Sequence, residues 1–127
     1  MLLTDTEWKV MNAVWRHEGS VSARDILTEV EPDTGWAYTT VKTMMDRLVE
    51  KGVLAVDRSS QKGAYRALIP RRRALHAAAR GLADKAFEGG MAPLVHFLIR
   101  SENLSPAERA ELRRMLAESE SEPGAGR

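Results

Sequence analysis

The chain has 127 residues, of which 43% are hydrophobic and 29% charged, and no apolar run approaches the roughly 20 residues that cross a bilayer. Nineteen Lys and Arg against eighteen Asp and Glu leave a net charge of +1, and the absence of cysteine excludes disulfides, thiolate catalysis and cysteine-bound metals. The N-terminal residues carry no basic segment followed by a long apolar stretch, so we expect no signal peptide and no membrane insertion. A cytoplasmic protein without cofactors is therefore expected.

The first predicted helix follows Thr4. Thr4 and Glu7 have the spacing of a capping box, in which each side chain bonds to the backbone N–H of the other residue. Trp8, Met11 and Trp15 then recur at helical spacing and form one broad apolar face, which we assign to the protein core.

A second predicted helix follows Ser22, which has capping-box spacing with Asp25. We expect this helix to end at Glu31, because Pro32 disfavours the α conformation of the residue before it. Trp36 lies in the connector that follows, where it either covers the core or stays exposed. The buried side of the helix is supplied by Ile26, Leu27 and Val30.

The third predicted helix covers residues 37–51 and is strongly two-sided. Gly52 follows it, at the position where a left-handed residue commonly ends a helix. The apolar face holds Val41, Met44, Met45, Leu48 and Val49. The opposite, polar face holds Thr39, Thr40, Lys42, Thr43, Asp46 and Arg47.

The pattern then changes to strands. Residues 53–57 and 64–69 are strand-like runs on either side of a polar loop at 58–63 that ends in glycine, which predicts an antiparallel hairpin. Three helices followed by a hairpin within residues 1–70 is the order of a winged helix-turn-helix domain. The predicted fold class is mostly α with a small β-hairpin.

Residues 71–118 predict a helical C-terminal domain. An apolar stripe runs from Leu75 to Phe87, a short hydrophobic segment follows Pro93, and Ser105 with Glu108 gives a further capping signal. Residues 119–127 are acidic, small and Gly/Pro-bearing, so we expect a disordered tail. The predicted organisation is thus a winged-helix domain at 1–70, a helical domain at 71–118 and a tail at 119–127.

The charges are distributed unevenly. Residues 1–36 hold three basic and seven acidic side chains, a net of −4, whereas residues 37–66 hold six basic and three acidic side chains, a net of +3. Clustered cations attract duplex phosphates, and a major groove accepts one helix, so double-stranded DNA is the predicted partner. The predicted contacts are Ser22, Tyr38, Thr39, Thr40, Lys42, Thr43, Arg47, Arg58, Ser60, Gln61 and Lys62.

Other interpretations of these features stay open. A polar helix face and a basic hairpin tip are also common as solvated surfaces, and a winged helix can serve protein–protein contact without binding DNA. Catalysis is not expected, because His17, His76 and His96 have no partners at the spacing of a metal site or a catalytic triad. No catalytic or metal-binding residue is assigned.

The apolar faces of residues 71–118 exceed what a segment of this size buries alone. A second copy would cover them, and a two-fold dimer would place two reading helices on successive turns of an inverted repeat. Alternatively, some of these side chains pack only within their own chain. The predicted dimer surface comprises Leu82, Phe87, Leu94, Val95, Leu98, Leu112, Met115 and Leu116.

Several segments resemble the BlaI/MecI/CopY repressors, and the likeness extends from Leu3 to Ala117. The resemblance implies a homodimeric winged-helix transcriptional repressor that dimerises through its C-terminal helices and binds dyad operators with TACA/TGTA-like half-sites. The matching segments are Leu3-Thr4-x-x-Glu7-Trp8, Val21-Ser22-Ala23-Arg24-Asp25-Ile26, Tyr38-Thr39-Thr40-Val41-Lys42-Thr43, Gly89-Gly90 and Leu94-Val95.

The resemblance also implies a route of induction. In the β-lactam-responsive members, a membrane-bound sensor protease cuts the repressor in its fifth helix, between Asn and Phe, and dimerisation is lost. The corresponding bond here joins Phe97 to Leu98, which departs from that pattern. The copper-responsive branch uses C-terminal cysteines that this chain lacks. We therefore expect relief of repression through disruption or proteolysis of the C-terminal dimer.

Overall fold

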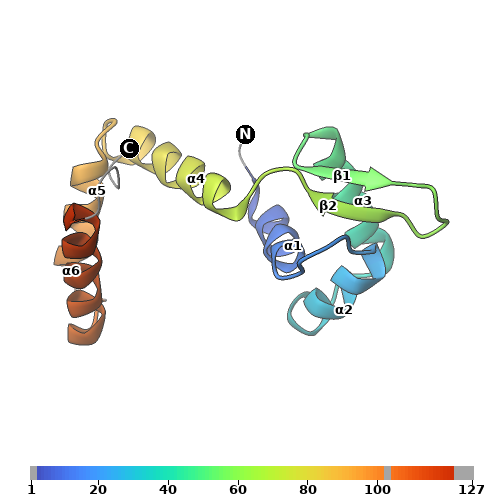
Figure 1. Cartoon of the computed structure of the whole chain (residues 1–127), viewed down its shortest axis with the longest axis horizontal. Coiled ribbons are helices and arrows are strands. Elements are labelled where there is room, and N and C mark those ends of the chain that lie inside the picture. Colours follow the sequence, from blue (N-terminus) through green and yellow to red (C-terminus); the bar gives the residue numbers. More distant parts are fainter. Residues whose placement is uncertain (1–2, 102–103, 122–127) are drawn as a thin grey trace. The chain divides into compact units, whose positions relative to one another are not determined.

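The computed structural model describes residues 3–101 and 104–121, which form two compact units, Met1–Ala78 and Ala79–Arg127 (Figure 1). Helix α4 runs through the boundary between these units. Six helices and one hairpin in the described residues confirm the predicted fold class, and no described helix is long and apolar enough to cross a membrane. In chain order the elements are α1 (Asp5–Trp15), α2 (Ala23–Thr34), α3 (Tyr38–Glu50), β1 (Leu54–Asp57), β2 (Ala64–Ala67), α4 (Arg71–Ala86), α5 (Met91–Arg100) and α6 (Pro106–Ser121).

Both predicted capping boxes are present. In α1 the Glu7 backbone N–H donates to Thr4 Oγ1 at 3.2 Å, and the Thr4 N–H donates to Glu7 Oε1 at 2.9 Å. In α2 the Asp25 N–H donates to Ser22 Oγ at 3.1 Å, and the Ser22 N–H donates to Asp25 Oδ2 at 3.0 Å. Each box satisfies backbone donors that the first turn of a helix leaves open.

The expected end of α2 at Glu31 is wrong, because the helix continues through Pro32 to Thr34. Pro32 lies in the last turn, where it removes the hydrogen bond to the Thr28 carbonyl, and both Thr28 and Pro32 are exposed, so that carbonyl is open to solvent. Gly35, with φ of +68°, ends the helix and donates to the Glu31 carbonyl at 2.8 Å. The glycine, and not the proline, sets the boundary.

The core of the first unit lies between α1, α2, α3 and the hairpin. Its largest fully buried side chains include Met11, Met45 and Tyr65, and the predicted apolar face of α3 is turned inward. Trp15 and Trp36 are partly buried and pack against this core, so Trp36 covers the core. The remaining buried positions of α3 are Val41 and Leu48, with Met44 and Val49 partly buried.

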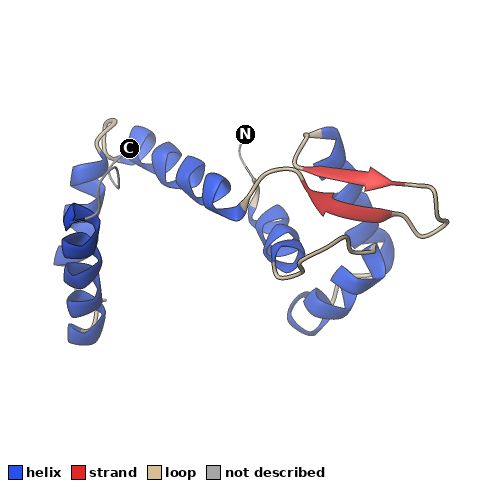
Figure 2. Cartoon of the chain, viewed as in Figure 1, coloured by secondary structure: helices blue, strands red, loops and turns tan. Residues whose placement is uncertain are grey.

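The predicted hairpin is confirmed, with β1 and β2 antiparallel and Leu54 opposite Ala67 (Figure 2). Val21, between α1 and α2, adds to the free edge of β2. Its N–H donates to the Tyr65 carbonyl at 2.8 Å, and the Tyr65 N–H returns a bond to the Val21 carbonyl at 2.7 Å. The backbone N–H and carbonyl of Tyr65 both bond to Val21, and Tyr65 is fully buried, so β2 is fixed to the segment between α1 and α2 close to the hairpin loop.

The second unit is helical. The rings of Phe87 and Phe97 lie 5.8 Å apart between their centroids, and Arg109 of α6 donates to the Ile99 carbonyl at 2.6 Å, which joins α6 to the end of α5. Helix α6 continues to Ser121, so residues 119–121 are helical and not part of a disordered tail. Residues 122–127 lie outside the described part of the chain.

Candidate nucleic-acid interface

Helix α3 begins differently from α1 and α2. Its N-cap is Ala37, which has no side-chain oxygen, so no side chain caps the N–H groups of the first turn. The aligned peptide dipoles give this end a partial positive charge, and the open N–H groups are donors for an anion. The first turn of α3 is therefore suited to a phosphate.

The polar face of α3 is available to a partner. Thr39, Thr40, Thr43 and Arg47 are exposed, and the Arg47 side chain makes no hydrogen bond or ion pair within the residues that the structure describes. Hydroxyl groups and a guanidinium are the side chains that reach base edges and phosphates in a major groove. These predicted contact residues share one surface on one rigid element.

Tyr38, the first residue of α3, is held by a neighbour that the sequence analysis did not single out. The Arg24 guanidinium, from α2, lies 4.6 Å from the centre of the Tyr38 ring. A cation over an aromatic face is attracted to it, so this contact links the starts of α2 and α3. Arg24 and Tyr38 are 14 positions apart, and no local sequence signal connects them.

Asp46 joins α3 to the hairpin. Its Oδ1 accepts a hydrogen bond from the Tyr65 hydroxyl at 2.8 Å and one from Arg58 Nη2 at 3.1 Å. Lys42, one turn earlier on α3, donates to Oδ2 at 3.0 Å. The sequence analysis placed Asp46 on the polar face, where the four-residue spacing from Lys42 was visible, but Arg58 and Tyr65 meet it only in the folded protein.

This cluster shifts the protonation of its members. Burial raises the pKa of Asp46, but the hydrogen bonds from Tyr65, Lys42 and Arg58 outweigh it, and the net pKa is below the ordinary value. The nearby Tyr65 hydroxyl, together with the Asp46 carboxylate, raises the pKa of Lys42. The carboxylate and the ammonium are therefore both charged at neutral pH.

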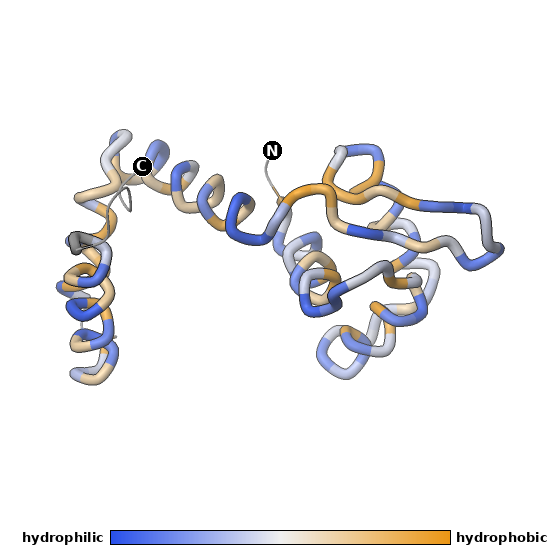
Figure 3. Tube along the Cα trace, in the orientation of Figure 1, coloured by the Kyte–Doolittle hydropathy of each residue, from blue (hydrophilic) through white to orange (hydrophobic). Residues whose placement is uncertain are grey.

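The hairpin loop projects from the first unit, and Figure 3 colours it as hydrophilic. Ser60, Gln61 and Lys62 are exposed there, as the sequence predicted for contact residues. Gly63 closes the loop with φ of +71°, a left-handed conformation that favours glycine. The loop therefore turns back into β2, where Ala64 pairs with Asp57.

Ser22 lies close to this loop. Its backbone N–H and hydroxyl lower the pKa of Asp25. The Ser22 hydroxyl accepts from Asp25 and still has its own hydrogen to donate. Ser22 directly follows Val21, whose backbone pairs with Tyr65 of β2, so Ser22 lies next to the hairpin.

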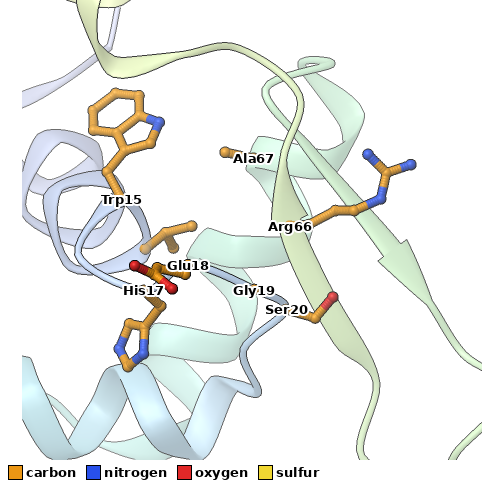
Figure 4. Close-up of a pocket in the computed structure, with 8 residues that line it drawn as sticks. Trp15, His17, Glu18, Gly19, Ser20, Arg66 and Ala67 are labelled. Carbon is orange, nitrogen blue, oxygen red and sulfur yellow. The ribbon is translucent and has the colours of Figure 1, made fainter.

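A pocket of about 320 Å³ opens between the end of α1 and β2, and His17 points from it toward α2 (Figure 4). His17 Nε2 lies 2.8 Å from Glu29 Oε1, outside hydrogen-bond geometry. Within the described residues, no group of three His, Asp or Glu could hold a metal ion. The pocket is lined by Val14, Trp15, His17, Glu18, Gly19, Ser20, Arg66 and Ala67.

The predicted dimer residues fall into two groups. Leu94 is only 7% exposed, because its own unit covers it, and Phe87 and Leu112 are partly covered. Phe97 and Leu98, the pair that the family resemblance suggests for cleavage, are exposed on α5. The other exposed members of the predicted surface are Leu82, Val95, Met115 and Leu116.

The chain matches known proteins along most of its length. The sequence model of the penicillinase repressor family matches residues 3–118. The methicillin resistance regulatory protein MecI of Staphylococcus aureus (strain N315) is 28% identical over 114 residues, which cover 90% of this chain and 92% of MecI. A penicillinase repressor of Staphylococcus aureus is 30% identical over 110 residues, covering 87% of this chain and 86% of that protein.

Among solved structures, the DNA-binding domain of the repressor BlaI aligns with a TM-score of 0.49 and 28% sequence identity, covering 54% of this chain and 83% of that one. The family match spans both units of the chain and confirms the resemblance found in the sequence. The chain belongs to the penicillinase repressor family.

Proposed function

We propose that the chain is a sequence-specific DNA-binding transcriptional repressor that occupies an inverted-repeat operator as a homodimer. One observation carries the proposal: α3 presents an uncapped N-terminus and an exposed Thr/Arg face, while Asp46 ties the basic hairpin to that same helix. The helix reads the major groove, and the hairpin loop contacts the adjacent backbone.

The contacts divide into two kinds. Thr43 and Arg47 reach base edges and set the preferred half-site, because hydroxyl and guanidinium groups distinguish bases in the major groove. Tyr38, at the uncapped start of α3, and Lys62, on the hairpin loop, contact phosphates and set affinity for any duplex. Ser22 adds a hydroxyl donor at the start of α2.

Dimerisation takes place through the second unit. Exposed leucine, valine and methionine side chains on α4, α5 and α6 leave an apolar surface that a second copy covers. A two-fold axis through that surface gives each operator half-site its own α3, and linking the two raises the overall affinity.

Repression is relieved by disrupting that dimer. The bond between Phe97 and Leu98 lies inside α5 and both side chains are exposed, so a protease that cuts it separates part of the apolar surface from the rest. A membrane-bound sensor protease is the proposed agent, by analogy with the family. Loss of the dimer then lowers operator occupancy.

The test is a fluorescence-anisotropy titration of the full chain on the DNA upstream of its own gene, with a random duplex as control. We expect at least about 1,000-fold tighter binding to the operator and a steep loss of affinity with salt. Arg47→Ala should reduce the preference, whereas the control change Arg16→Ala, at the C-terminal cap of α1, should leave it unchanged. Equal, weak binding to both duplexes would contradict the proposal and favour a protein–protein module.

A further inference from the structure

A negative charge sits among the cations of the proposed DNA-facing surface. Lys42 Nζ lies 3.0 Å from Asp46 Oδ2, and Arg58 Nη2 lies 3.1 Å from Oδ1. One carboxylate therefore pairs with two of the basic side chains that the sequence predicts to contact DNA. The second carboxylate near this surface, Asp57, accepts from Ser59, whose N–H lies 2.9 Å away, and pairs with no cation in the described part of the chain.

The position of Asp46 is fixed by a neutral donor as well. The Tyr65 hydroxyl donates to Oδ1 at 2.8 Å, and Tyr65 is fully buried, lies opposite Val56 in the hairpin and exchanges two backbone hydrogen bonds with Val21. The carboxylate therefore stays beside the cations when solvent or DNA competes for them. Asp46, Lys42 and Arg58 are all partly exposed, so phosphate oxygens can reach the same cations.

Two effects on DNA binding follow from this arrangement. A carboxylate beside Lys42 and Arg58 reduces the positive potential that any duplex meets, and non-specific binding depends almost wholly on that potential. The same carboxylate holds the hairpin against α3, which fixes the geometry for one docked site. A random duplex gains nothing from that fixed geometry, whereas the operator does.

We propose that Asp46 is a specificity-determining residue: it withholds Lys42 and Arg58 from the phosphates of random duplex DNA and sets the hairpin for the operator. This inference rests on the proposed function. Its consequence is a larger ratio of operator to random affinity, obtained by weakening the random complex and not by adding a base contact.

The test compares Asp46→Asn with the matched control Asp57→Asn in the full chain. Both changes remove one negative charge near the same surface and keep an amide oxygen as acceptor, but only the first frees cations. Dissociation constants are measured by anisotropy for an operator duplex and a random duplex over a range of salt concentrations. For Asp46→Asn we expect about three- to tenfold tighter random binding at about 0.1 M salt, with a salt slope steeper by about one to two per half-site.

Asp46→Asn should tighten binding to the operator duplex less than binding to the random duplex, so the preference for the operator falls. Asp57→Asn should change the dissociation constants for both duplexes by the same factor. If Asp46→Asn behaves as Asp57→Asn does, or weakens both complexes equally, the inference is overturned while the proposed function stands. A wild-type chain without operator preference would overturn both.

Tyr65→Phe gives a second, independent variant. It removes only the hydroxyl that fixes Asp46 and keeps every charge, so operator affinity should fall while the random constant and its salt slope stay the same. Should the Asp46→Asn protein fail to fold, this variant decides, and an unchanged operator constant would overturn the inference. Thermal unfolding of each variant shows which proteins are folded.

Discussion

Glu7 of α1 and Lys51, the residue at the C-terminal cap of α3, form an ion pair with 2.7 Å between Oε1 and Nζ. The same Oε1 accepts the Thr4 N–H at 2.9 Å, so one carboxylate both caps α1 and joins it to α3. Glu7 is the charged residue among the buried positions. The Glu7 side chain therefore takes part both in the capping box of α1 and in a tertiary contact with α3.

Glu7→Gln should destabilise the first unit in a pH-dependent way. Burial raises the pKa of Glu7, but Lys51 and Thr4 outweigh it and hold the pKa below 4.5. As the pH falls, Glu7 is therefore protonated in the unfolded chain at a higher pH than in the folded protein. The stabilisation is fully present above the pKa of Glu7 in the unfolded chain, and it is lost as the pH falls through the pKa of Glu7 in the folded protein. We expect a loss of about 1 kcal/mol at pH 7 that shrinks below about pH 4.

Tryptophan fluorescence during urea unfolding measures this effect, because Trp8, Trp15 and Trp36 are the chain's three tryptophans and all lie in the first unit. Glu50→Gln, an exposed change on α3, serves as the control. A difference between wild type and Glu7→Gln that stays constant from pH 7 to pH 3 would contradict the assignment.

Trp15→Phe should lower the free energy of unfolding of the first unit. The indole Nε1 of Trp15 donates to the Ile69 carbonyl at 3.0 Å, which fixes the chain just before α4. Loss of that bond costs about 1 kcal/mol beyond the loss of ring area. Trp8→Phe makes the same change in the neighbouring ring, whose centroid lies 6.0 Å from that of Trp15, without loss of a hydrogen bond of this kind, and should cost less in the same unfolding assay.

Local signals carried most of the prediction of the first unit. The two capping boxes, the apolar face of α3 and the hairpin depend on residues within a few positions of one another, and all were visible in the sequence. The end of α2 was missed because the rule for Pro32 concerns one residue, whereas Gly35 ends the helix three residues later. Pro32 and Gly35 both indicate a helix end, and in the structure the left-handed Gly35 ends α2.

The long-range contacts could not be predicted from the sequence. The Asp46 cluster joins positions 12 and 19 residues apart, and the bond from Trp15 to Ile69 spans 54 residues. Leu94 was assigned to the dimer surface because α5 is apolar on several sides, and periodicity does not say which side its own chain covers. Such contacts are decided by packing, for which one sequence gives no pattern.

Arg47→Ala should change the preference among half-site variants. A lost base contact costs about 1–3 kcal/mol for the preferred base pair and little for others. Lys62→Ala on the hairpin loop should instead weaken binding to every duplex and lower the salt slope by about one per half-site. Anisotropy titrations on a set of single-base operator variants separate these outcomes, and equal losses on all of them for Arg47→Ala would place Arg47 among the phosphate contacts.

Leu98→Glu should weaken dimerisation and operator binding together. Leu98 is 46% exposed on α5, and a carboxylate in a dimer interface would be buried without a partner. Leu68→Glu is the matched control, because that leucine is 47% exposed but lies in the first unit. Sedimentation equilibrium measures the dimer constant, and a Leu98→Glu protein that stays dimeric would contradict the proposed surface.

The missing side-chain cap at Ala37 has a practical consequence for experiments. The leading amide protons of α3 should exchange readily with solvent deuterium in the free protein, because no side chain caps them. A docked phosphate would slow that exchange at Tyr38 and Thr39. Amide exchange at these two residues would thus report DNA binding in the unmodified protein, at the point where the N-terminus of α3 would meet the DNA phosphates.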